Sequence, residues 1–281
     1  MAQQTAPSRW AKFWNRGGWW KALIVAVVYL ALYEAGGLLL SLIIPAPEPG
    51  SALEVLLRVA LPIALGSVVL IVFAISIGWL QELFARQPIR GRWWMWIAVG
   101  AVLLFNVLRF ASLDYGSASL HLVVAWLITG LFVGFAEETL TRGFVVNLMR
   151  KAGHPEIAVA LVSATTFALL HAVNLLSGQD LVTTAMQVVY TFAFGLCMYL
   201  TLRVTGHLIW PILLHASTDP SIFLHGAHPA AGAISSIADL GNIVVIITGL
   251  VLLIFIRGRV ERPADPALRA PLSGKRVALL A

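Results

Sequence analysis

Long apolar runs dominate the chain and leave little sequence between them. There are eight, covering residues 22–44, 59–80, 93–113, 122–146, 157–176, 181–202, 208–223 and 234–256. A membrane-spanning helix needs about 20 mostly apolar residues, because the hydrocarbon core of a bilayer is about 30 Å thick. Only 11% of the residues are charged, against about 25% in an average soluble domain. The sequence therefore predicts an all-α, polytopic membrane protein with about eight transmembrane helices.

Lysine and arginine are divided unequally between the two sets of helix ends. Only Arg58 and Arg109 lie at one set, and the other 17 of the 19 basic residues lie at the opposite set or in the terminal extensions. This asymmetry supports an even number of spans with both termini in the cytoplasm. We expect a multi-pass protein of a bacterial-type plasma membrane, with membrane lipid as a partner. The net charge of +6 does not indicate nucleic-acid binding, because the basic residues sit at membrane edges.

The apolar runs form one membrane domain, residues 22–256, between two basic extensions. Residues 1–21 precede it, and the first apolar run exceeds the roughly 7–15 residues of a signal-peptide core, so we expect a retained first helix. Residues 257–281 form a basic, proline-containing tail for which we expect no packed core. The single cysteine, Cys197, allows no intrachain disulfide and is interpreted as a small buried hydrophobe.

The fourth run carries three ionisable side chains, Glu137, Glu138 and Arg142. Charged groups at membrane depth are costly, so they mark a functional site by default. Glu138 and Arg142 are four residues apart and can pair on one helix face, whereas Glu137 is turned by about 100° from Glu138. The alternative is that both glutamates only pair with basic groups and hold helices together.

The fifth run places Phe167 and His171 four residues apart, near its far end, and Asn174 follows one turn later. A single histidine at a helix end is often a structural residue with satisfied hydrogen bonds. The glutamates on the neighbouring helix make a functional role for His171 a serious alternative.

The seventh run places His215 and Asp219 four residues apart, and Pro220 follows. Proline disfavours helical geometry in the residue before it, so we expect the helix to end or kink at Asp219. An opened helix is tolerated in a membrane where it lines a polar cavity. The alternative is a capping Asp-Pro turn in which Asp219 accepts a hydrogen bond from His215.

Glu137, His171 and His215 could converge around one water molecule. Glu137 would accept its proton, His171 would orient it, and His215 would stabilise the oxyanion that forms. The three runs together therefore indicate hydrolytic chemistry within the membrane.

The spacing of these residues resembles the CPBP family, also called Abi or CAAX-protease-like membrane proteins. The family pattern is E-E-x-x-x-R, then F-x-x-x-H, then H-x-x-x-N or D. Here it reads Glu137-Glu138-Thr-Leu-Thr-Arg142, Phe167-Ala-Leu-Leu-His171 and His215-Ala-Ser-Thr-Asp219. All three motifs occur in the family order, and they fall within residues 122–223.

The resemblance implies an intramembrane glutamic-type endopeptidase whose catalytic core lies on helices 4, 5 and 7. It implies that Glu137 is the general base, that His171 shares the water, and that His215 and Asp219 form the oxyanion site. Glu138, Arg142 and Phe167 would support these residues. The implied substrate is a membrane-associated or lipidated CAAX-type protein, or a propeptide. We expect the site within the membrane, reached by water from the cytoplasmic side.

Asp219 departs from the asparagine that many members carry. An ionised aspartate only accepts hydrogen bonds and would repel an oxyanion. We therefore expect Asp219 to orient His215 while another donor completes the oxyanion site.

A zinc-dependent mechanism is the alternative to metal-free hydrolysis. Two histidines and a carboxylate match a catalytic zinc site in ligand type, and Glu137, His171 and His215 would be the ligands. Their spacing differs from H-E-x-x-H, and we favour a mechanism without metal or other cofactor.

Two other functions remain open from the sequence. A non-catalytic scaffold or immunity protein of the same family would keep the motifs as remnants. A proton- or ion-coupled transporter would use Glu34, Glu137, Glu138 and the histidines as a relay, although no inverted repeat is visible. Glu34, in the first run, is the one acidic residue that the protease interpretation leaves unexplained.

Overall fold

The computed structural model describes residues 8–260, and helices without strands build this part of the chain. Seven helical runs are long and apolar enough to cross a membrane: Trp19–Ile43, Ala52–Ser76, Trp93–Ala111, Leu120–Lys151, Glu156–Leu175, Leu181–Thr205 and Ala233–Leu253. The remaining predicted span is helix α11 (Ile209–Ala227), whose polar side chains make it less apolar. The all-α, multi-pass membrane prediction is confirmed.

Several of the spanning runs change helix type along their length. Their segments are α2 (Trp19–Ile43); α3 (Ala52–Glu54), π-helix η1 (Val55–Ala60) and α4 (Leu61–Ser76); 3₁₀-helix η2 (Trp93–Met95) and α6 (Trp96–Ala111); α7 (Leu120–Glu138), π-helix η3 (Thr139–Val145) and α8 (Val146–Lys151); α9 (Glu156–His171) and 3₁₀-helix η4 (Ala172–Leu175); α10 (Leu181–Thr205); α12 (Ala233–Asp239) and α13 (Gly241–Leu253). Two short helices, α1 (Arg9–Asn15) and α5 (Leu80–Phe84), were not predicted.

Pro220 does not end α11, contrary to the expectation from sequence. The helix continues through it to Ala227. Hydroxyl groups add hydrogen bonds on both sides of the proline, from Thr218 Oγ1 to the Leu214 carbonyl at 2.9 Å and from Ser221 Oγ to the Thr218 carbonyl at 2.7 Å. Such side-chain bonds help a membrane helix to tolerate proline.

Two glycines on α7 bring α11 into backbone contact. A Cβ atom on Gly130 would lie 2.2 Å from the Ala216 carbonyl oxygen, and one on Gly134 would lie 2.5 Å from the Ile212 carbonyl oxygen. Small residues four apart allow this close approach of membrane helices. Because Glu137 and Glu138 follow on α7 and His215 lies on α11, this contact sets the distance between them.

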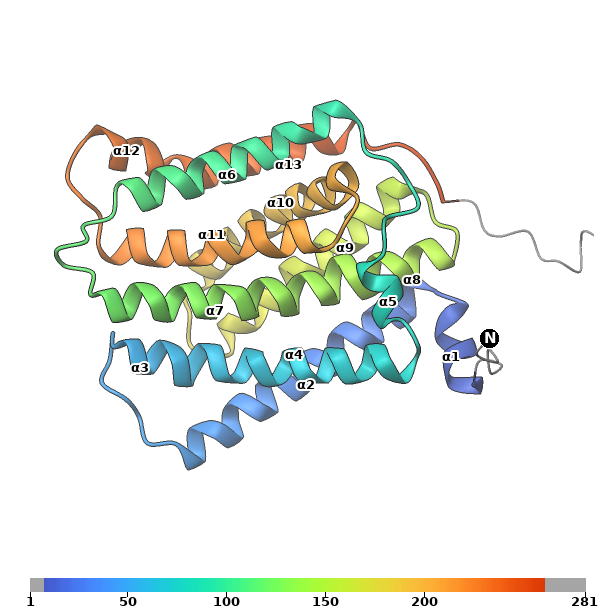
Figure 1. Cartoon of the computed structure of the whole chain (residues 1–281), viewed down its shortest axis with the longest axis horizontal. Coiled ribbons are helices and arrows are strands. Elements are labelled where there is room, and N and C mark those ends of the chain that lie inside the picture. The colour runs from blue at the N-terminus through green and yellow to red at the C-terminus, as the bar shows by residue number, and fades with distance from the viewer. Residues whose placement is uncertain (1–7, 261–281) are drawn as a thin grey trace, which may run out of the picture.

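The basic helix ends gather at one end of the bundle. There, the Gly18 amide donates to the Leu148 carbonyl, the Glu156 amide donates to the Gly258 carbonyl, and Arg203 Nη2 donates to the Arg90 carbonyl at 3.3 Å. Both ends of the described chain lie at this end (Figure 1). The arrangement agrees with the unequal charge distribution. Most of the predicted tail, with Arg262, Arg269, Lys275 and Arg276, lies outside the described residues.

A buried ion network ties the helices together at this end. Glu156 binds Arg150 through both carboxylate oxygens, at 2.9 and 2.7 Å, and Arg203 Nη1 at 3.0 Å. The Tyr199 hydroxyl also donates to Glu156. Two guanidinium groups and one hydroxyl thus satisfy a single buried carboxylate, which links α8, α9 and α10.

Replacing Gly134 with alanine tests the contact between α7 and α11. We expect Gly134→Ala to lower the free energy of unfolding by roughly 1–3 kcal/mol, because the added methyl overpacks the interface. The measurement is thermal unfolding of the purified protein in detergent.

Gly100→Ala on α6 is the matched control, because a Cβ atom there meets nothing within 4 Å. We expect it to leave the stability unchanged or to raise it by up to about 1 kcal/mol, the difference in helix propensity. Equal effects of the two substitutions would contradict the close approach.

Candidate active site

A buried ion pair lies at the junction of α7 and η3 and forms one part of the site. Arg142 Nη1 lies 2.9 Å from Glu138 Oε1, and both side chains are fully buried. Arg142 also donates to Thr141 Oγ1 at 2.7 Å and to the Gly195 carbonyl on α10 at 2.8 Å. The π-helical segment η3 contains Arg142, and such segments occur frequently at functional sites. The pair predicted from the four-residue spacing is therefore present, and it anchors α7 to α10.

Glu138 also holds His215. The Nδ1 atom of His215 lies 2.8 Å from Glu138 Oε1, and only 2% of the His215 side chain is exposed. A carboxylate oxygen accepts, so Nδ1 is the donor and Nε2 is left for another partner. Glu138 thus connects the Arg142 guanidinium to the His215 imidazole.

Asp219 does not orient His215 through a hydrogen bond, contrary to our expectation. Its Oδ1 atom lies 3.7 Å from His215 Nε2, outside hydrogen-bond distance. Glu138 makes that hydrogen bond instead, on the opposite nitrogen. The sequence could not show this, because Glu138 and His215 are 77 residues apart and meet only where α7 and α11 pack together.

Glu137 lies beside His215 with one oxygen unused. Its Oε2 atom is 3.7 Å from His215 Nε2. That oxygen is buried and has no hydrogen-bond partner within residues 8–260. A buried carboxylate oxygen without a partner is costly, so it indicates a position where water or a substrate group binds.

His171 shares a cavity with Glu137. This cavity of about 110 Å³ is lined by Glu137, His171, Asn174 and residues of α2. The Nδ1 atom of His171 lies 3.0 Å from the Phe167 carbonyl oxygen, which can only accept. Nδ1 therefore carries the proton in a neutral His171, and Nε2 remains as an acceptor.

Phe167 lies against the three cationic or basic groups of the site. Its ring centroid is 4.9 Å from that of His171 and 5.6 Å from that of His215, both edge to face. The Arg142 guanidinium carbon lies 4.7 Å from the same ring. Phe167 therefore spaces the two imidazoles and covers the arginine, which explains an aromatic residue at the first position of the F-x-x-x-H motif.

The structure places a carboxylate oxygen of Glu137 and one of Asp219 each 3.7 Å from His215 Nε2, and it places His171 in the same cavity as Glu137. Sequence reasoning missed Tyr29, which lines that cavity, and it left Glu34 unassigned although Glu34 lines it too. The available signal was the cluster of polar side chains, Tyr29, Tyr33 and Glu34, in an apolar run.

The zinc-dependent alternative concerns Glu137, His171 and His215. Within residues 8–260, no three side chains among His, Cys, Asp and Glu are grouped so that they could hold a metal ion. The preference for hydrolysis without metal stays a prediction, which a metal assay on the purified protein tests.

Comparison with known families agrees with the motifs. Residues 119–221 match the family model described as type II CAAX prenyl endopeptidase Rce1-like. These bounds nearly coincide with the segment 122–223 that carries the three motifs, so the resemblance stated from the sequence is confirmed. At family level the match indicates a membrane protease. No curated protein matches the chain.

Removing one member of the Glu138–Arg142 pair tests its contribution to the fold. We expect Glu138→Leu to destabilise the protein by about 3–5 kcal/mol, because it leaves a buried, unpaired guanidinium. The double variant Glu138→Leu/Arg142→Met should recover part of that loss. Thermal unfolding in detergent measures both, and a double variant less stable than Glu138→Leu would contradict a structural role for the pair.

Proposed function

We propose that the protein is an intramembrane endopeptidase that hydrolyses a peptide bond with a water molecule activated by Glu137. The observation that carries this proposal is the unpartnered, buried Oε2 atom of Glu137, beside His215 and in one cavity with His171. A carboxylate in this position can accept a proton from water and later return it to the leaving amine.

His171 would orient the attacking water. Its Nδ1 proton is engaged by the Phe167 carbonyl, so Nε2 is free to accept a hydrogen bond from water in the shared cavity. Glu137 would accept the second hydrogen bond of the same water. The lone pair of the water oxygen would then face the scissile carbonyl carbon. Positioning of this kind lowers the entropic part of the barrier.

His215 would stabilise the oxyanion of the tetrahedral intermediate. The carboxylates of Glu137, Glu138 and Asp219 surround its ring and would stabilise the imidazolium form, whose Nε2 proton can be donated. Glu138, held in turn by Arg142, would keep the ring oriented. Asp219 would stabilise the imidazolium charge. The hydrogen bonds to the oxyanion would come from His215 and a further group.

The family match favours a membrane-associated, CAAX-type prenylated protein as substrate, and a propeptide is the other candidate. The chain would span a plasma membrane, with both termini and the basic end of the bundle in the cytoplasm. Glu137 as general base distinguishes this proposal from a scaffold or immunity protein, which needs no water chemistry, and from a transporter, which needs no cleavage.

Glu137→Gln tests the proposed base. We expect at least a 10²-fold loss of kcat, because the amide cannot accept the proton, with little change in thermal unfolding. Purified protein in nanodiscs would be incubated with a library of membrane and prenylated peptides, and cleavage would be followed by mass spectrometry.

Glu48→Gln is the control, because Glu48 is exposed in the loop after α2; its cleavage rate should equal that of the wild type. Retained cleavage in Glu137→Gln would exclude Glu137 as the base. No cleavage of any peptide by the wild type would favour the scaffold or transporter.

Metal dependence is a separate test. We expect the purified protein to bind zinc only substoichiometrically and to keep its cleavage rate after dialysis against 1,10-phenanthroline. Metal content would be measured by mass spectrometry on the same samples. One zinc per chain, lost together with activity and restored by added zinc, would contradict metal-free hydrolysis.

A further inference from the structure

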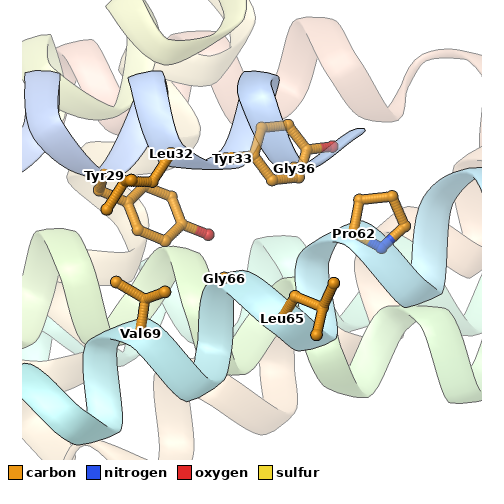
Figure 2. Close-up of a pocket in the computed structure, with 8 residues that line it drawn as sticks. All are labelled: Tyr29, Leu32, Tyr33, Gly36, Pro62, Leu65, Gly66 and Val69. Atoms are coloured by element: carbon orange, nitrogen blue, oxygen red, sulfur yellow. The ribbon is translucent and has the colours of Figure 1, made fainter. Parts of the chain in front are cut away.

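Two small cavities lie along the contact between α2 and the neighbouring helices. One, of about 110 Å³, contains Glu137 and His171 in its wall. The other, of about 50 Å³, lies between α2 and α4 (Figure 2). Tyr29 and Tyr33 line both cavities. The seam between α2 and α4 is therefore adjacent to the site where the water would be activated.

Tyr29 presents an unused hydrogen-bond donor at this seam. Its side chain is only 5% exposed, and its hydroxyl has no hydrogen-bond partner within residues 8–260. Figure 2 shows the ring projecting from α2 towards Gly66 on α4. A Cβ atom on Gly66 would lie 2.8 Å from the hydroxyl oxygen, so glycine leaves room for it. A buried hydroxyl without a partner costs free energy. This indicates that a bound ligand accepts a hydrogen bond from Tyr29.

Glu34 is an exposed residue that also lines the larger cavity, where its carboxylate can accept a hydrogen bond. Among residues 8–260, no group forms a hydrogen bond or an ion pair with its carboxylate. Asn174 lines the same cavity and donates its amide to Gln187 Oε1 at 2.9 Å, which leaves its own carbonyl oxygen as a second acceptor. The cavity therefore offers one donor and two acceptors beside the proposed base.

We propose that this cavity is a subsite for a backbone peptide group of the substrate next to the scissile bond. Tyr29 donates to the carbonyl oxygen of that group, and Glu34 accepts its N–H. The subsite rests on the proposed function and names two binding residues outside the three family motifs. It also assigns a role to Glu34, the acidic residue in the first span.

The size and chemistry of the cavity suit one peptide group. A volume of about 110 Å³ corresponds to three or four water molecules at about 30 Å³ each. A peptide group brings both the acceptor that Tyr29 lacks and a donor for Glu34 or Asn174. A lipid chain would leave all of these groups unsatisfied, so the subsite selects the polar backbone of the substrate.

The test uses a fluorescent peptide that ends in S-farnesyl-Cys-Val-Ile-Met, with the full chain in nanodiscs. We expect Tyr29→Phe and Glu34→Leu, which remove the donor and the acceptor, each to raise KM by about three- to tenfold, the worth of one hydrogen bond, and to leave kcat within about twofold. Tyr115→Phe and Glu48→Leu, both at exposed positions, are the matched controls and should leave KM unchanged.

Ester probes separate binding from a general structural effect. Replacing one amide N–H beyond the scissile bond with an ester oxygen should weaken binding to the wild type by a similar factor. Glu34→Leu should lose no further affinity for that ester, because the partner of Glu34 is already absent. A merely structural effect of Glu34→Leu would instead weaken amide and ester peptides equally.

Binding of the same peptides is also measured in the Glu137→Gln background, where the proposed function predicts no cleavage. If the wild type does not cleave but Tyr29→Phe and Glu34→Leu still weaken binding, the proposed function fails and the subsite stands. If the wild type cleaves with an unchanged KM in both variants, the subsite is overturned alone. Absence of any peptide binding overturns the subsite together with the proposed substrate class.

Discussion

A polar or charged group in the interior of a membrane protein needs a partner inside the protein, and one carboxylate is that partner for both an arginine and a histidine here. Glu138 accepts from Arg142 and from His215 through the same oxygen. Removing Glu138 would leave Arg142 and His215 buried without this acceptor, which destabilises the folded protein. The positions of α7, α10 and α11 relative to one another follow from this shared acceptor.

Backbone contact and electrostatics act together at this point. Gly130 and Gly134 allow α11 to approach α7 closely enough for His215 to reach the glutamates. At the basic end of the bundle, Glu156 satisfies Arg150 and Arg203 in the same manner. Two buried carboxylates, Glu138 and Glu156, thus hold the helices together at two positions along the bundle. α2 supplies the outer wall of the cavity that holds the unused oxygen of Glu137.

The fold class and the motif residues could be predicted from the sequence, because long apolar runs and four-residue spacings are local properties. The partner of His215 could not, since the choice between Asp219 and Glu138 depends on the packing of two helices distant in the chain. Pro220 suggested a helix end, but hydroxyl groups and neighbouring helices stabilise the helix through it. Tyr29 and Glu34 belong to no motif, and only the three-dimensional arrangement places them beside Glu137.

The π-helical segment η3 (Thr139–Val145) has a consequence for how the protein tolerates changes in length. A π-helical turn accommodates one residue more than an α-helical turn, with hydrogen bonds between residues five apart. An α-helical turn would hold one residue fewer over the same stretch, so η3 can absorb a one-residue deletion without rotating α8 relative to α7. In the regular α-helix on either side, the same deletion would turn every following side chain by about 100°. Arg150, which lies after η3, would then turn away from Glu156. The length of this span is thus least constrained at η3, next to the buried ion pair.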